Sequence, residues 1–443
     1  MSARWAQMTA AELGREINGG RISPVDLAEA HLDAIAAHPH RDRIFARTTP
    51  ARARAEAMAA HGRARAGQRR SLIDGVPVGW KDNFDTAGIV TEAGSALLKG
   101  RLPDRDAEVL STATLMGLVC LGKTHLTELA FSGLGLNPVT ATPPCINDDR
   151  AVPGGSSSGA AASVAFGLAP AGIGSDTGGS VRIPAAWNDL VGLKTTAGRL
   201  STRGVVPLAE RFDTVGPIAK TVEDCAHLMA ALEGTRPIDL SGPSLSGMRL
   251  MVLDTVALDQ LRDRPGQGFD DALVRLSGAG ARIDHVRVPE VAEAMGLSPV
   301  LFAGEAYGIW RDAIEAAPEK MYPRILERFR GGAGFSASDY VAAWRRLEVL
   351  RDRWQAATAA YDAVLLPTAP ILPPDAGRLL TDEEYFVTEN LLALRNTRIG
   401  NLMGLCALTL PTVQPSCGIS FMAAAGREER LLRLGAAAEA ALR

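Results

Sequence analysis

Two short segments rich in glycine and serine constrain the fold of this chain more than any other feature. They are residues 154–159 (GGSSSG) and 174–180 (GSDTGGS). Glycine at this density favours tight turns, because it adopts backbone conformations that other residues avoid. The small residues of 159–166 predict a helix between the turns, and the apolar residues of 171–174 predict a strand. Turns that bracket a helix and a strand carry their hydroxyl groups toward one end of a sheet, where α/β proteins bind ligands.

Elsewhere the chain alternates between helical and strand-like segments, which favours an α/β fold. A turn and a short strand end at Lys81, and a helix near 106–116 precedes a strand near 117–121. Residues 234–247 are rich in glycine, proline and serine and are the best candidate for a linker, whereas residues from about 256 to 360 are largely helical by pattern. A length of 443 residues permits one to three domains.

The composition excludes several classes of partner. The 47 basic and 50 acidic residues nearly cancel, and the net charge of −3 gives no single-sign field for nucleic acid or an anionic membrane. No apolar stretch is long enough to span a bilayer, and the N-terminus lacks the apolar segment of a signal peptide. The five cysteines contain no C-x-x-C pair, which argues against a disulfide framework or a zinc site. We therefore expect a cytoplasmic protein whose partner is a small molecule.

The second glycine-rich segment has the groups that acyl transfer needs. The backbone amides of Thr177, Gly178, Gly179 and Ser180 can form a concave nest of N–H donors, which suits a developing oxyanion. A nucleophile must stand beside such donors, and Ser180 is at their end. Serine is a poor nucleophile without a base, and none of the seven histidines is next to a glycine-rich turn. A Ser-His-Asp triad is therefore weakly supported.

Lys81 is the candidate base. Only six of the 47 basic residues are lysines, and lysine, unlike arginine, can lose its proton when it is buried. A neutral lysine at pH 7 requires roughly 4–5 kcal/mol of shift from its usual pKa, which deep burial can supply. Ser156, in the first glycine-rich segment, can relay the proton between Ser180 and Lys81.

Three separated motifs in this order resemble those of the amidase signature family. The motifs are GVPVGWKDN at 75–83, GGSS at 154–157 and DTGGSVRIP at 176–184. The resemblance is closest over residues 70–230. It implies an α/β/α sandwich on a mixed central β-sheet, as a single domain over residues 1–443 with the catalytic motifs between 74 and 217.

By this resemblance the protein is expected to be an amidase that cleaves a carboxamide to a carboxylate and ammonia or an amine. Ser180 is then the nucleophile that forms an acyl-enzyme, and Lys81 is the general base. Ser156, which follows a cis peptide bond in the family, bridges the two. The oxyanion is expected at the four amides of residues 177–180. The resemblance implies no metal and no cofactor.

Two other functions stay open at this stage. The glutaminase subunit of a tRNA-dependent amidotransferase shares this domain, but a chain of 443 residues is short for it. A catalytically degenerate protein that only binds a carboxamide is the second, although all three catalytic positions are filled. The number of protomers is also open, with a homodimer among the options.

Four further residues near the motifs receive structural or binding interpretations. Trp80 and Trp187 are bulky, and either the acyl pocket or the hydrophobic core can account for them. Asp176 and Arg182 predict a structural ion pair that braces the turn before Ser180. The substrate-binding role of the two tryptophans is an expectation for the structure to test.

Overall fold

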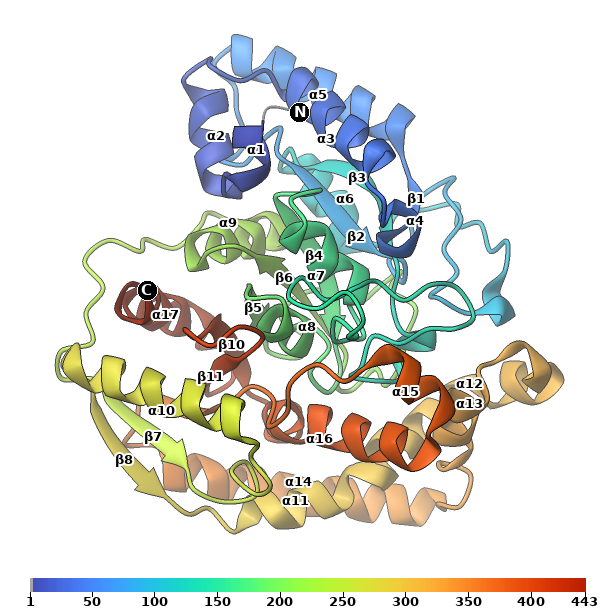
Figure 1. Cartoon of the computed structure of the whole chain (residues 1–443), viewed down its shortest axis with the longest axis vertical. Helices are drawn as coiled ribbons and strands as arrows, with labels where there is room; N and C mark the ends of the chain where they lie inside the picture. Colours follow the sequence, from blue (N-terminus) through green and yellow to red (C-terminus); the bar gives the residue numbers. More distant parts are fainter. Residues whose placement is uncertain (1–2) are drawn as a thin grey trace.

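A mixed β-sheet runs through the computed structural model, which describes residues 3–443 (Figure 1). The strands are β1 (Phe45–Thr48), β2 (Pro77–Lys81), β3 (Val119–Thr124), β4 (Ala171–Asp176), β5 (Val191–Lys194), β6 (Thr214–Ala219), β7 (Arg249–Leu253), β8 (Arg282–Val286), β9 (Ala363–Pro367), β10 (Cys406–Pro411) and β11 (Gly418–Ala423). Within the described residues these eleven strands form one sheet in the order β1-β3-β2-β4-β6-β5-β10-β11-β9-β7-β8. β2 pairs in parallel with β3 and β4, and β7 with β8 and β9, whereas the other neighbours pair antiparallel.

Helices cover both faces of this sheet. The helices are α1 (Ala3–Gln7), α2 (Ala10–Asn18), α3 (Pro24–Ala37), α4 (Arg41–Ile44), α5 (Pro50–Arg65), α6 (Glu108–Leu115), α7 (Ser158–Ala165), α8 (Arg182–Trp187), α9 (Val222–Glu233), α10 (Asp263–Gly278), α11 (Glu290–Ser298), α12 (Gly304–Ala316), α13 (Pro323–Arg330), α14 (Ala337–Thr358), α15 (Ala376–Thr381), α16 (Glu383–Leu402) and α17 (Glu428–Leu442). Short 3₁₀ turns are η1 (Ala96–Leu98), η2 (Glu128–Ala130) and η4 (Pro318–Lys320), and a π-helical turn, η3 (Pro299–Ala303), joins α11 to α12. None of the helices described for residues 3–443 combines the length and the apolar character that a membrane span requires.

The alternation of side chains along the strands explains the three layers. Leu250 and Val252 of β7 pack in a core cluster with α9, α10 and α17, whereas Met251 and Leu253 pack on the other face with α11 and α14. Successive residues of a strand point to opposite faces, so a strand that is apolar throughout is buried on both sides. The predicted α/β/α sandwich with a mixed sheet is therefore confirmed (Figure 1).

One strand lies where the sequence pattern favoured helix. Residues from about 256 to 360 contain α10 to α14, but they also contain β8, which pairs in parallel with β7 at the edge of the sheet. Arg282, Asp284 and His285 of β8 are exposed polar residues. An edge strand of this kind has no apolar alternation, and the sequence pattern therefore does not reveal it.

The central strands bring the predicted catalytic segments together. β2 and β4 are parallel neighbours, with Trp80 opposite Ile173, so their carboxyl ends lie at the same edge of the sheet. Lys81 is the last residue of β2, and the turn that contains Ser180 follows β4 directly. The first glycine-rich segment enters α7, which packs on β4.

Candidate active site

Ser180 lies in the tight turn between β4 and α8. Gly179, just before it, has a φ of +140°, and a Cβ at this position would collide with Thr397 Oγ1 of α16. Only glycine fits there without strain, because other residues avoid this conformation. Ser180 itself is 3% exposed and lines a pocket. The turn thus presents one hydroxyl group at the floor of a cavity.

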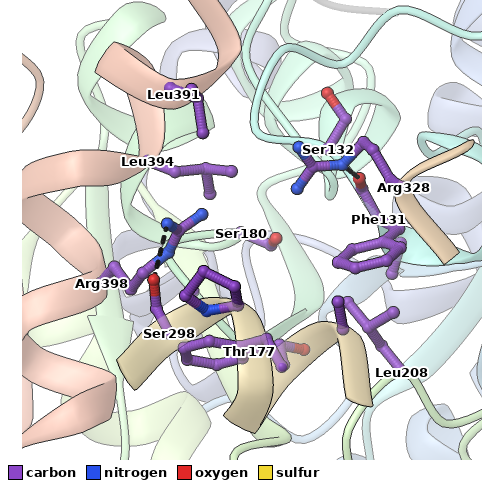
Figure 2. Close-up of a pocket in the computed structure, with 15 residues that line it drawn as sticks. Phe131, Ser132, Thr177, Ser180, Leu208, Ser298, Arg328, Leu391, Leu394 and Arg398 are labelled. Carbon is purple, nitrogen blue, oxygen red and sulfur yellow. Dashed lines mark hydrogen bonds between the residues drawn. The ribbon is translucent and has the colours of Figure 1, made fainter. Parts of the chain in front are cut away.

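This pocket has a cavity volume of about 190 Å³. Its walls come from segments that are far apart in the sequence. The lining residues include Phe131, Phe302 of η3 and Leu394 of α16. Figure 2 shows the Ser180 hydroxyl between Phe131 and Leu394. The lining is mainly apolar, with a few polar and charged side chains, which is the usual character of a small-molecule site.

Lys81 is fully buried beneath this floor and makes hydrogen bonds to two serines. Its Nζ donates to Ser156 Oγ at 2.7 Å and to Ser175 Oγ at 2.8 Å, and it lies 3.3 Å from the Ser175 carbonyl oxygen. Asn83 Nδ2 donates to the same Ser175 hydroxyl at 3.0 Å. Among residues 3–443 no carboxylate lies within ion-pair distance of Lys81 Nζ. The carboxylates of Asp213 and Asp176 affect its pKa only from farther away.

Burial lowers the pKa of Lys81 to about 7, although the carboxylates of Asp213 and Asp176 raise it in part. The cause is the loss of hydration of the ammonium group, which favours the neutral amine. A lysine with this pKa is partly neutral at physiological pH. It can therefore accept a proton, which an ordinary surface lysine cannot do.

Ser156, predicted to bridge Ser180 and Lys81, makes one half of that bridge, the hydrogen bond from Lys81. The peptide bond from Gly155 to Ser156 is cis, and Ser156 is fully buried. The next residue ties the two glycine-rich segments together, since the Ser157 amide donates to the Ser180 carbonyl oxygen at 3.2 Å. Over the described part of the chain no hydrogen bond links the Ser156 and Ser180 hydroxyls, so the structure joins Ser156 to Lys81 directly and to Ser180 only through the backbone.

The four predicted oxyanion donors are not equivalent in the structure. The Gly179 amide donates to Asp176 Oδ1 at 2.9 Å and is therefore occupied. The amides of Thr177, Gly178 and Ser180 make no hydrogen bond with any other described group, and Thr177, Gly178 and Ser180 all line the pocket. These three N–H groups are the donors that remain for a ligand oxygen.

Asp176 and Arg182 form the buried ion pair that the sequence predicted. Arg182 Nη2 and Nε donate to the two Asp176 carboxylate oxygens at 2.9 and 3.0 Å, and both residues are fully buried. Arg182 also donates to the Thr397 carbonyl oxygen at 2.7 Å and to Asn401 Oδ1, both on α16. Burial alone would raise the pKa of Asp176, but the Arg182 charge outweighs it and holds that pKa well below its usual range.

Sequence reasoning missed Asp213, which braces the turn from the other side. Thr177 Oγ1 donates to its Oδ1, and the Leu208 amide donates to its Oδ2 at 2.9 Å. Burial raises the pKa of Asp213 to about 6, despite these hydrogen bonds. Asp213 lies in the segment FDTVGP at 212–217, where no local pattern marks it as a partner of Thr177.

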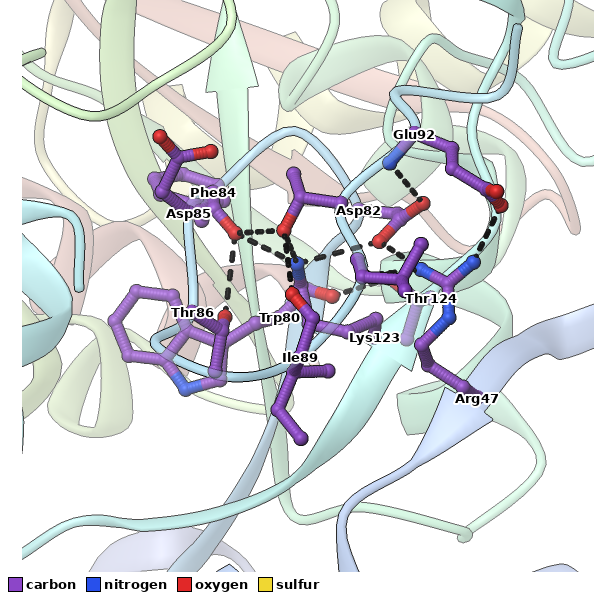
Figure 3. Close-up of polar contacts among 12 residues, drawn as sticks. Arg47, Trp80, Asp82, Phe84, Asp85, Thr86, Ile89, Glu92, Lys123 and Thr124 are labelled. Atoms are coloured by element: carbon purple, nitrogen blue, oxygen red, sulfur yellow. Dashed lines mark hydrogen bonds and ion pairs between the residues drawn. The ribbon is translucent and has the colours of Figure 1, made fainter. Parts of the chain in front are cut away.

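A second polar cluster holds the segment that follows Lys81 (Figure 3). Asp82 accepts a hydrogen bond from Arg47 Nη1 at 2.6 Å and lies 3.2 Å from Lys123 Nζ. Arg47 Nη2 also pairs with Glu92 at 2.6 Å. Lys123 is fully buried, and burial lowers its pKa. The cluster lies outside the pocket, and we interpret it as support for the end of β2.

The structure places Trp80 and Trp187 in the hydrophobic core and not in the pocket wall. Trp80 is 1% exposed and packs edge-on against Phe84, and Trp187 is fully buried and donates from Nε1 to the Ile371 carbonyl oxygen at 3.2 Å. Trp80 precedes Lys81 on the same strand, so the two side chains point to opposite faces of the sheet. The expected substrate-binding role of these residues is therefore replaced by core packing.

Two arginines that the sequence did not single out line the pocket instead. Arg328 comes from α13 and Arg398 from α16, and Figure 2 shows their guanidinium groups on either side of Ser180. Burial lowers the pKa of Arg328 to about 9, with a further effect of Arg398, and lowers the pKa of Arg398 to about 10. Within residues 3–443 no three His, Cys, Asp or Glu side chains gather in a way that could hold a metal ion.

Nearly the whole chain matches a known family. The model of the amidase family covers residues 26–432, so the chain belongs to this family and is an amide-hydrolysing enzyme. It is 34% identical to 2-amino-5-chloromuconic acid deaminase of Comamonas testosteroni, over 98% of this chain and 97% of that protein. It is 31% identical to the A subunit of glutamyl-tRNA(Gln) amidotransferase from Synechococcus elongatus, over 93% and 92% of the two chains. A solved structure described as an amidase superposes with a TM-score of 0.85 at 30% identity, over 98% of this chain and 100% of that one.

Proposed function

We propose that this enzyme hydrolyses a carboxamide to a carboxylate and ammonia or an amine through an acyl-enzyme on Ser180. Lys81 is the general base, and Ser156 relays the proton between them. The observation that carries this proposal is the 2.7 Å hydrogen bond from Lys81 Nζ to Ser156 Oγ, made by a buried lysine whose pKa is about 7. A base of that pKa is matched to a reaction near neutral pH.

In the first half-reaction the amide is exchanged for an ester. Neutral Lys81 takes the proton of Ser156 as Ser156 takes that of Ser180, and the Ser180 oxygen bonds to the carbonyl carbon. The C–N bond then breaks as the proton returns through Ser156 to the leaving nitrogen. A side-chain rotation of Ser156 or Ser180 makes the missing hydrogen bond, since such contacts are often long in ligand-free enzymes.

In the second half-reaction water replaces the serine oxygen. Lys81, through Ser156, accepts a proton from the attacking water. The C–O bond to Ser180 then breaks as this proton returns through Ser156 to the Ser180 oxygen, and the product acid loses its own proton to solvent and leaves as the carboxylate. Each half-reaction passes through an oxyanion, for which the free amides of Thr177, Gly178 and Ser180 are the available donors. Loss of one such donor costs roughly 100- to 1,000-fold in turnover in comparable sites.

Ser180→Ala tests the nucleophile. The variant should lose amide turnover and covalent labelling by a fluorophosphonate probe while keeping its melting temperature, because the change removes one hydroxyl group. Ser132→Ala is the matched control, since Ser132 lines the same pocket but donates its hydroxyl to Asn390 Oδ1 at 2.8 Å. Near-wild-type turnover in Ser180→Ala would overturn the assignment, whereas Ser132→Ala should keep the label.

A second candidate function is the glutaminase subunit of a tRNA-dependent amidotransferase, because the relative from that class of enzyme is 31% identical over 93% of this chain. Such a protein delivers ammonia to partners and should be slow alone. We expect the isolated chain to release ammonia or amine from at least one simple amide, with glutamine a poor substrate. Vigorous glutamine hydrolysis that partner proteins and tRNA stimulate would instead favour the transferase role.

A further inference from the structure

The two arginines of the pocket carry charges that the protein itself does not neutralise. Arg328 and Arg398 line the pocket on either side of Ser180 (Figure 2). Within the described chain, residues 3–443, no carboxylate lies within ion-pair distance of either guanidinium group. Some other half-buried arginines have such a partner, as Arg52 has in Glu56 and Asp106, whereas Arg351 and Arg395 donate to backbone carbonyl oxygens outside the pocket.

The contacts that these arginines do make leave most of their donors free. Arg328 Nε donates to the Phe131 carbonyl oxygen at 2.8 Å, and its guanidinium group lies 4.7 Å from the centre of the Phe131 ring. Arg398 has one weak contact, 3.5 Å from Nη1 to Ser298 Oγ, and lies 5.7 Å from the Phe302 ring. These contacts hold the side chains in place, but they bring no negative charge.

Two unneutralised cations in an apolar cavity are costly unless a ligand brings the opposite charge. Taking a charge out of water is unfavourable, and a nearby like charge adds to the cost. Guanidinium groups present several N–H donors in a plane, an arrangement that matches a carboxylate. The arrangement is therefore built for an anion that reaches Ser180.

We propose that the substrate of this enzyme is the monoamide of a short dicarboxylic acid, whose free carboxylate is held by Arg328 and Arg398 while its amide carbonyl lies at Ser180. This proposal rests on the function proposed above, because it places the reacting amide at the same serine. It adds the chemical class of the acyl group, which neither the fold nor the family determines.

The cavity volume sets the length of that acid. A cavity of roughly 150 Å³ accommodates benzene, with six heavy atoms, so a volume of about 190 Å³ has room for roughly eight. An amide group and a carboxylate take three heavy atoms each, which leaves space for a linker of about two carbons. Succinamate has this composition, and malonamate and glutaramate are one carbon shorter and longer.

Binding to a catalytically silent protein separates this proposal from the mechanism. In the Ser180→Ala background, calorimetry should detect succinamate, whereas the neutral and nearly isosteric succinamide should bind at least roughly 10-fold more weakly. Adding Arg398→Met should weaken succinamate by roughly 10- to 100-fold and leave succinamide unchanged. Arg398→Lys should restore part of the affinity, because it keeps the charge but not the planar donors.

Arg395→Met is the matched control. Arg395 stands on the same helix, makes its contacts to Asn396 and to the Ala257 carbonyl oxygen, and is not part of the pocket lining. It should leave succinamate binding unchanged. Arg328→Met in the same background provides an independent test of the second cation, with its melting temperature recorded, because Arg328 also anchors the Phe131 carbonyl group.

The outcomes distinguish the two proposals. Equal affinity for succinamide and succinamate, an equal effect of Arg398→Met on both, or no binding of malonamate, succinamate or glutaramate would overturn the carboxylate site. Arginine-dependent binding of succinamate without hydrolysis by the wild-type enzyme would leave the carboxylate site standing and count against the proposed chemistry. Faster hydrolysis of succinamide than of succinamate by the wild type would support the proposed chemistry and count against the carboxylate site.

Discussion

Replacing Lys81 by methionine should abolish turnover and also remove an energetic cost that the wild-type protein carries. Lys81 is fully buried, and burial lowers its pKa from 10.5 to about 7. Between these two values the lysine binds fewer protons in the folded chain than in the unfolded chain, so the free energy of unfolding rises with pH. The cost is therefore fully present below about pH 7 and is lost as the pH approaches about 10.5.

The size of the effect follows from the shift. A difference of about 3.5 pKa units, at about 1.36 kcal/mol each, amounts to between about 4 and 5 kcal/mol near pH 7. At about pH 9.5 only about 1.4 kcal/mol of this remains. Methionine has a similar length but leaves Ser156 Oγ without its donor, at about 1–3 kcal/mol, whereas Ser175 Oγ keeps the hydrogen bond from Asn83. That loss does not depend on pH, whereas the cost of the buried amine does.

Urea unfolding of the wild type and of Lys81→Met at about pH 7 and about pH 9.5 measures the difference. The free energy of unfolding of the variant relative to the wild type should fall by about 3 kcal/mol between the two conditions. Titratable groups that both proteins share cancel in this comparison. A difference that stays constant with pH would refute the lowered pKa of Lys81 and the neutral base that depends on it.

The remaining predictions concern the pH profile and the turn. With chemistry rate-limiting, kcat/KM should rise with pH through a midpoint near the Lys81 pKa of about 7, as the neutral amine accumulates, and a profile flat from about pH 5 to 10 would contradict this. Gly179→Ala should inactivate the enzyme and lower its melting temperature, because its φ is +140° and the new Cβ would collide with α16; in Gly178→Ala the nearest atom is 3.7 Å away, so equal melting temperatures for the two variants would argue against the steric account. Asp176→Asn should destabilise the protein by about 3–5 kcal/mol in urea unfolding, because it leaves the Arg182 charge buried without its partner, and a loss below about 1 kcal/mol would show that the pair is dispensable.

The catalytic candidates could be predicted from the sequence because their roles are tied to short motifs. Lys81 ends a strand, and Ser156 and Ser180 stand in glycine-rich turns whose order along the chain is itself informative. The alternation of side chains along a strand also predicts where Trp80 lies. Trp80 is adjacent to Lys81 on β2, and neighbours on a strand face opposite sides, so Trp80 could have been assigned to the core.

The pocket could not be predicted in the same way, because its walls are assembled only by tertiary packing. Arg328 and Arg398 stand on helices whose local sequences contain other arginines, and nothing in their neighbourhoods marks them as pocket residues. Asp213 gains its role from a contact with Thr177 across 36 positions of the chain. The selectivity of such a site depends on side chains that become neighbours only after folding. Local sequence patterns therefore do not predict which residues form it.

The contacts of Arg182 bear on when, during synthesis of the chain, the turn that contains Ser180 can fold completely. Its guanidinium group reaches the Thr397 carbonyl oxygen and Asn401 Oδ1, across 215 and 219 positions of the chain. A growing polypeptide therefore contains Lys81, Ser156 and Ser180 long before α16 exists to complete the brace behind their turn. Ser180 can take its final position only when nearly the whole chain has been made, so on the proposed mechanism a prematurely terminated product would be inactive. On the proposed assignments, the same division lets exchanges in α13 and α16 alter the choice of acyl group without changing Lys81, Ser156 or Ser180.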